Sequence, residues 1–169
     1  MLSLLMAGTM SVCISGGDVW AENTVKLTSD TVYNVIGEIP ASIEMNGHNI
    51  TSNVMLNADN AGLSIIGTDM ENLTINGEGL QFAVAAQSSS NAKVLISNVK
   101  KVDITGNVIN DSLLHSNING AIIFDKVGLF NITTEKSIGL HAQGGLIYID
   151  ADAVSIKSKD ENAIWAQLS

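Results

Sequence analysis

The sequence predicts an all-β fold, a right-handed parallel β-helix (solenoid) of roughly five or six coils with an atypical N-terminal capping region. Three observations favour this fold. A unit of about 24 residues recurs along the chain, and apolar and polar residues alternate with a period of two inside each unit. The apolar content of 46% is mostly Ile, Val, Leu and Ala, with a single proline. Such a composition suits short strands whose side chains stack in one narrow core.

The recurrence is clearest in the second half of the chain, where segments with the same apolar pattern lie 24 residues apart. Earlier copies lie 28 or 29 residues apart, and the extra residues fall in the polar stretches 106–112 and 88–92, as expected for loop insertions. The pairs with the 24-residue offset are Phe130 and Val154, Ile132 and Ile156, Leu140 and Ile164, Ala142 and Ala166, Gln143 and Gln167, Ile123 and Ile147, and Phe124 and Tyr148.

Within each unit the alternation indicates strands. Phe130 and Ile132 share one face, whereas Asn131 and Thr133 share the other. One coil of about three short strands cannot bury its apolar face alone, so coils must stack and pair their backbones in parallel, about 4.8 Å apart. Like residues then form ladders inside the solenoid. The facing of residues 145–151 stays open, because both parities are apolar there.

Residues 22–70 are assigned to an N-terminal cap and first coil, and residues 71–169 to the β-helix repeats, which look truncated at the C-terminus. Residues 23–70 repeat less well, and Asn46-Gly47 between two short runs predicts a hairpin turn. An atypical coil is expected here because the open end of a solenoid needs cover. A sandwich of short strands is the alternative fold, but it gives no reason for a regular spacing.

The N-terminal residues 1–21 predict a signal peptide. The stretch has no charge before Asp18, and its apolar run is too short to span a bilayer but suits the core of an export signal. Small residues place cleavage after Ala21. The basic n-region is apparently missing, since the first basic residue is Lys26. The alternatives are a buried N-terminal strand or a lipoprotein acylated at Cys13.

The net negative charge of the chain argues against nucleic acids as partners. The chain has 17 acidic and 8 basic residues, a net charge of −9, and all the basic residues are lysines. A negative surface repels phosphate backbones, so we expect no nucleic-acid partner. The single cysteine allows neither a disulfide within the chain nor a cysteine-spaced zinc site, and we expect no cofactor.

No catalytic, cofactor-binding or metal-ligating residue is assigned from the sequence. Paired carboxylates on a β-helix are typical of polysaccharide-cleaving enzymes, but a solvated turn is the preferred interpretation here, because no arginine accompanies them. His141 aligns with Trp165 on the outward face, which indicates a solvated strand residue rather than a ligand. The most acidic cluster consists of Asp150, Asp152, Asp160 and Glu161.

The repeats SIGLHAQGGLIYIDADAVSIKS and NAIWAQ, with the signal-like start ending in VWAEN, resemble passenger domains of bacterial autotransporters, which have a pectin-lyase-like β-helix. The resemblance covers nearly the whole chain. It implies an N-terminal passenger fragment at the surface of a two-membraned bacterium, or secreted from it, and translocated by a C-terminal β-barrel that is absent here. We therefore expect a structural or adhesive role without catalysis, with surface glycans or proteins as partners. The alternative is a fragment of a β-helical polysaccharide lyase or glycoside hydrolase.

Overall fold

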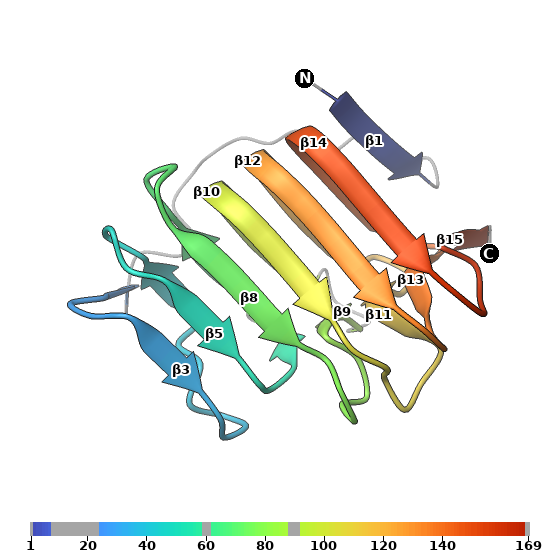
Figure 1. Ribbon diagram of the computed structural model, residues 1–169, viewed down its shortest axis with the longest axis horizontal. Helices are drawn as coiled ribbons and strands as arrows, with labels where there is room; N and C mark the ends of the chain where they lie inside the picture. Colours follow the sequence, from blue (N-terminus) through green and yellow to red (C-terminus); the bar gives the residue numbers. More distant parts are fainter. Residues whose placement is uncertain (1, 8–23, 59–61, 88–91, 168–169) are drawn as a thin grey trace.

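The computed structural model describes residues 2–7, 24–58, 62–87 and 92–167. The chain forms a parallel β-solenoid of about five turns, in which each coil lies beside the next (Figure 1). This confirms the predicted all-β solenoid. Within the described part of the chain we find no helix with the length and apolar character needed to cross a bilayer.

The strands form three faces, and among the described residues the third face begins one coil later than the other two. The first face holds β2 (Thr24–Lys26), β4 (Ser42–Glu44), β7 (Leu63–Ile66) and the first parts of β10 (Lys93–Thr105), β12 (Ala121–Thr134) and β14 (Leu146–Ser158). The second face holds β3 (Thr31–Tyr33), β5 (Ile50–Ser52), β8 (Asn72–Asn76) and the second parts of the three long strands. The third face holds β6 (Leu56–Asn57), β9 (Val84–Ala86), β11 (Ser112–Ser116), β13 (Ile138–Gln143) and β15 (Ile164–Gln167).

The strand register confirms the interior ladders of the second and third faces. On the second face Ile104 lies beside Ile132, which lies beside Ile156 in the next coil. On the third face Leu140 lies beside Ile164. Both Ile104 and Ile132 are completely buried in one continuous apolar core. Like residues therefore stack on like residues from coil to coil, as a repeating sequence requires.

The 24-residue offset is wrong for the first face. There Ile122 pairs with Ile147 and Phe124 with Ile149, an offset one residue longer. The cause is a register shift between Phe124 and Val127, a β-bulge in β12 that places one extra residue against β14. The same register settles the open facing of residues 145–151. Ile147 and Ile149 join the core, and Tyr148 belongs to the opposite face of the strand.

The turn at Asn46-Gly47 exists, but the hairpin predicted around it is wrong. Both residues have positive φ, 53° and 86°, and the amide of His48 donates to the carbonyl of Met45 at 3.0 Å. The flanking strands do not pair with each other, because β4 pairs in parallel with β2 and β7, and β5 with β3 and β8. The turn is thus a corner between two faces of one coil.

Corners of this kind recur between the first and second faces. The next three coils place single non-glycine residues with positive φ there: Asp69 at 67°, Asn98 at 53° and Lys126 at 53°. The corners turn the chain while its strands stay paired with those of neighbouring coils. The first coils, within residues 24–70, already follow this parallel stacking.

The last coil is less buried than those before it. Val154 and Ile156 are partly exposed, and in β15 Ile164 and Trp165 are 42% and 45% exposed. The strand β1 (Leu2–Ala7) pairs antiparallel with β14 and lies at that end of the sheet (Figure 1). The predicted cleavage site after Ala21, and Cys13, lie outside the described residues. The signal peptide over residues 1–21 concerns processing, so it stays a prediction.

Candidate functional site

The four acidic residues singled out in the sequence do not gather at one place. Asp150 and Asp152 lie within β14, in a strand rather than in the expected turn, whereas Asp160 and Glu161 are exposed in the turn that follows it. Asp150 is only 9% exposed, and its Oδ1 has no hydrogen-bond partner among the described residues. The residues around a shallow hollow of about 130 Å³ at this corner are Asp69, Lys126, Val127, Gly128, Asp150, Ala151 and Asp152.

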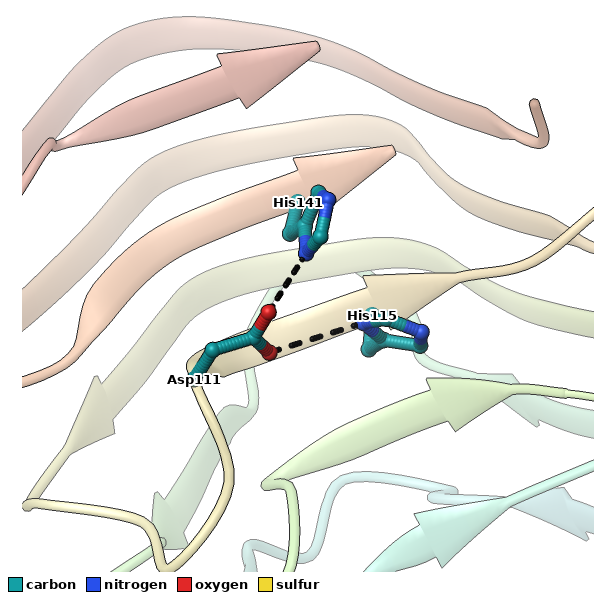
Figure 2. A group of neighbouring side chains, drawn as sticks. All are labelled: Asp111, His115 and His141. Atoms are coloured by element: carbon teal, nitrogen blue, oxygen red, sulfur yellow. Dashed lines mark hydrogen bonds and ion pairs between the residues drawn. The ribbon is translucent and has the colours of Figure 1, made fainter. Parts of the chain in front are cut away.

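A second polar cluster lies on the third face and consists of Asp111, His115 and His141 (Figure 2). Each residue offers one potential metal-ligating atom, and these atoms all lie within 4.8 Å of one another. Asp111 directly precedes β11, His115 lies in β11, and His141 lies in the neighbouring strand β13. The site therefore spans two successive coils.

The parallel register brings the two histidines together, because His115 pairs with His141 in the β11–β13 ladder. A break in the alternation brings Asp111 into reach. Leu113 and Leu114 are consecutive, yet both belong to the core. The residues on either side of this pair, Ser112 and His115, consequently lie close together, with Ser112 Oγ 3.3 Å from His115 Nδ1.

The carboxylate of Asp111 lies beside the two imidazoles, with one oxygen facing each ring (Figure 2). Its Oδ2 is 2.9 Å from His141 Nδ1, and its Oδ1 is 3.8 Å from His115 Nδ1. The hydroxyl of Ser112 donates to Asp111 Oδ1 at 3.0 Å. His115 Nε2 lies 2.8 Å from Asn117 Oδ1. Since an amide oxygen only accepts, Nε2 carries the proton, and Nδ1 of a neutral His115 presents its lone pair to the cluster.

Aromatic rings enclose both imidazoles. Phe82 stacks on His115 with centroids 4.5 Å apart, His115 meets His141 edge to face at 5.1 Å, and Trp165 stacks on His141 at 5.1 Å. The alignment of His141 with Trp165 is confirmed, but the expectation that His141 is solvated is wrong. It is only 5% exposed, because rings on both sides and Asp111 cover it. Its Nε2 has no hydrogen-bond partner among the described residues.

Burial lowers the pKa of His115 below its ordinary value of 6.5. The hydrogen bond to Asn117 and the charge of Asp111 act in the opposite direction, whereas the nearby His141 lowers the pKa further. His115 is therefore mainly neutral at pH 7. The neutral imidazole is the form that binds a metal ion.

The contacts from Ser112 to His115 and on to Asn117 have the order of a nucleophile, a base and an orienting group. Ser112 is nevertheless completely buried. Its hydroxyl is therefore closed off from the solvent side, from which a substrate carbonyl would have to approach.

This cluster was not predicted from the sequence, although the sequence contains one signal for it. Extending the repeat alignment one coil back places Leu114-His115-Ser116 on Leu140-His141-Ala142, which stacks the two histidines. The contact of Asp111 with the histidines had no such signal in the repeat alignment. It depends on Leu113 and Leu114 both pointing into the core, which breaks the alternation. Comparisons with protein-family models, with curated proteins and with solved structures found no match to this chain.

Proposed function

We propose that this chain is a β-solenoid segment of an exported bacterial surface protein, with a structural or adhesive role and no catalysis. The observation that supports this role best is the coil-on-coil stacking, in which every ladder of the core joins one coil to the next. A solenoid of this kind is stabilised between neighbouring coils. It makes a stiff spacer whose length is set by the number of coils.

The same architecture leaves the outward positions free to vary. On β12 Ile132 is completely buried, whereas Asn131 is half-buried and Thr133 is exposed. Such alternation gives a polar surface along the solenoid without disturbing the core. Surface glycans or proteins are the partners that this outward surface would bind. The signal-like N-terminus and the resemblance to autotransporter passenger domains support the location outside the cell.

The experiment is surface labelling of intact cells of the producing bacterium, with antibodies raised against the folded protein. We expect labelling without permeabilisation, and loss of the signal after brief treatment of the cells with protease. A cytoplasmic protein of the same cells serves as the control and must stay unlabelled and undigested. Labelling that requires permeabilisation would overturn the proposed location.

The alternative, a fragment of a polysaccharide-cleaving β-helix, is favoured by one observation. Asp69, Asp150 and Asp152 line the same hollow as Lys126, so three carboxylates and one cation share a solvent-facing corner of the solenoid. Carboxylates in this arrangement could hold a calcium ion or transfer a proton. An assay of polygalacturonate cleavage separates this activity from a stalk without catalysis.

A further inference from the structure

We propose that Asp111, His115 and His141 bind one divalent transition-metal ion of the zinc class, which joins two neighbouring coils of the solenoid. This site is independent of the proposed stalk function. Two imidazoles and one carboxylate form a common ligand set for zinc in proteins, with the fourth position left to water. Imidazole ligands favour Zn²⁺, Ni²⁺ and Cu²⁺ over Mg²⁺ and Ca²⁺.

The distances suit such an ion after small side-chain rotations. Bonds of about 2.0–2.2 Å in a tetrahedron place neighbouring ligand atoms about 3.4 Å apart. The two separations from Asp111 are 2.9 Å to His141 Nδ1 and 3.8 Å to His115 Nδ1, one on each side of that value. Two of the three ligands, His115 and His141, stand at paired positions on neighbouring strands, and Asp111 directly precedes one of these strands, so the site is largely formed before the ion binds.

A supporting hydrogen bond already orients one ligand. Histidines that bind metals usually donate their other ring N–H to an oxygen acceptor, which fixes the tautomer and the ring orientation. Asn117 Oδ1 accepts in this way from His115 Nε2 at 2.8 Å. The Nδ1 lone pair is therefore directed toward Asp111 rather than toward solvent.

The cluster also has more acceptors than donors. Ser112 has one hydroxyl proton, but both Asp111 Oδ1, at 3.0 Å, and His115 Nδ1, at 3.3 Å, lie within its reach. When the hydroxyl donates to Asp111, the buried Nδ1 of His115 has no other donor among the described residues. Among the described residues no lysine forms an ion pair with Asp111. A bound cation would satisfy both acceptors and balance the carboxylate.

One ligand of the proposed site is open to solvent, and the other two are buried. The side chain of Asp111 is 45% exposed, which gives an ion a path from solvent and leaves room for a water ligand. The side chains of His115 and His141 are only 8% and 6% exposed. Phe82 and Trp165 hold the two rings from above and below the pair. The ion would thus be bound at the surface by ligands that cannot easily swing away.

The test is a titration of the full chain with ZnCl₂ after treatment with a chelator, followed by calorimetry and by thermal unfolding. We expect one equivalent to bind and the unfolding temperature to rise with the concentration of free Zn²⁺, since the ion binds the folded chain alone. Ca²⁺ and Mg²⁺ at the same concentrations should leave the unfolding temperature unchanged. Asp111→Asn and His141→Phe should each abolish this binding, and Asn117→Ala should weaken it about 10- to 100-fold.

The matched control is His48→Gln. His48 also lies 3.8 Å from a carboxylate, that of Asp30, but no third ligand accompanies this pair among the described residues. Its replacement should leave Zn²⁺ affinity unchanged. Circular dichroism checks that each variant folds. Should His141→Phe not fold, Asp111→Asn decides the matter, because that change is conservative and lies at a partly exposed position.

A spectroscopic measurement identifies the ligand atoms. NMR of the imidazole nitrogens should show Zn²⁺-dependent shifts at Nδ1 of both His115 and His141, and none at His48. Equal binding by the wild type and by Asp111→Asn would show that Zn²⁺ binds elsewhere on the acidic surface, and would overturn the proposal. Absence of any saturable binding would overturn it as well.

Discussion

The Nδ1 atom of His141 lies 2.9 Å from Oδ2 of Asp111, thirty residues earlier in the chain. The contact joins the loop before β11 to the middle of β13 in the next coil. Residues about one repeat apart become neighbours throughout this molecule, so pairs that look unrelated along the sequence share one environment.

The first prediction concerns the interior ladder. Replacing Ile132 by Asp places a carboxylate in a completely buried apolar site, so we expect a loss of more than about 3 kcal/mol in the free energy of unfolding. Asn131→Asp, the neighbouring outward position, should change it by about 0.5 kcal/mol. Denaturant midpoints measure both. Equal effects at the two positions would contradict the inward assignment of Ile132.

The same ladder predicts that an Asp substitution destabilises the protein less in the last coil than in the coil before it. Ile156 lies beside Ile132, but it is partly exposed. Ile156→Asp should therefore cost less than half as much as Ile132→Asp, because water reaches the carboxylate. The same denaturant midpoints check this expectation, and an Ile156→Asp loss as large as that of Ile132→Asp would contradict it.

The second prediction is a pH dependence due to Glu71. Burial by itself would raise the pKa of Glu71, but hydrogen bonds from Thr68, Gly47 and Met70 lower it from 4.5 to about 2. A carboxylate whose pKa falls on folding stabilises the protein above its ordinary pKa, and this contribution is lost as the pH falls toward 2. Stability should therefore decline between about pH 4.5 and pH 2.

Glu71→Gln isolates this contribution. The variant exchanges an acceptor carboxylate for an amide facing three backbone N–H groups, so we expect a loss of about 2 kcal/mol at pH 7. The difference between wild type and variant should shrink as the pH approaches 2, because the wild-type carboxylate is then protonated too. Glu135→Gln, at an exposed position, is the control and should show no such convergence. A pH-independent Glu71→Gln effect would exclude the charge as its cause.

The third prediction concerns a close approach between coils. A Cβ added at Gly120 would collide with the carbonyl oxygen of Ala86, a backbone atom that cannot move without shifting its coil. Gly120→Ala should cost about 3 kcal/mol. Gly79→Ala adds a Cβ in open space and suffers only from its positive φ of 72°, so about 1 kcal/mol is expected. Thermal unfolding measures the stability of the two variants. Equal stability of Gly120→Ala and Gly79→Ala would contradict the close approach between coils.

The fourth prediction is that export removes residues 1–21. Intact-mass measurement of the protein recovered from the surface of the producing bacterium should give a chain that begins at Glu22. The uncharged apolar run before Asp18 is the reason for this expectation. A surface protein that still begins at Met1 would show that the N-terminal segment is retained, and β1 would then remain paired with β14.

The fifth prediction is that acidic polysaccharides are not cleaved, with or without calcium. No arginine is present to neutralise a sugar carboxylate, and the acidic residues at the hollow lie apart from Asp160 and Glu161. Ultraviolet absorbance of unsaturated products from polygalacturonate measures lyase cleavage, and newly formed reducing ends measure hydrolysis. A reproducible product that disappears in Asp150→Ala would instead assign the hollow as a catalytic site.

Much of the fold follows from the sequence because the solenoid repeats one local rule. The alternation around Phe130 and Ile132 specifies which face is inward, and the 24-residue spacing specifies which residues stack. The error on the first face came from the bulge at Lys126, since one inserted residue changes the offset without altering the apolar pattern. The hairpin error at Asn46-Gly47 arose because turn chemistry specifies a local reversal and not the strands that pair afterwards.

The candidate site was harder to foresee, for a physical reason. Parity correctly places His141 on the outward side, and outward residues of a strand are ordinarily solvated. Whether such a residue is buried depends on its neighbours in adjacent coils, here His115 and Trp165. Both neighbours can be identified from the sequence only when three successive coils are aligned together. A pairwise alignment of two coils shows Trp165 but not the second histidine.

The stack of Trp165 on His141 has a practical consequence. The chain has two tryptophans, and removal of residues 1–21 would take Trp20 with it. The mature protein would then hold one indole, with its ring centroid 5.1 Å from that of His141. Intrinsic fluorescence would report on that imidazole directly, so that protonation, ion binding or separation of the last coil could each be followed without an attached dye.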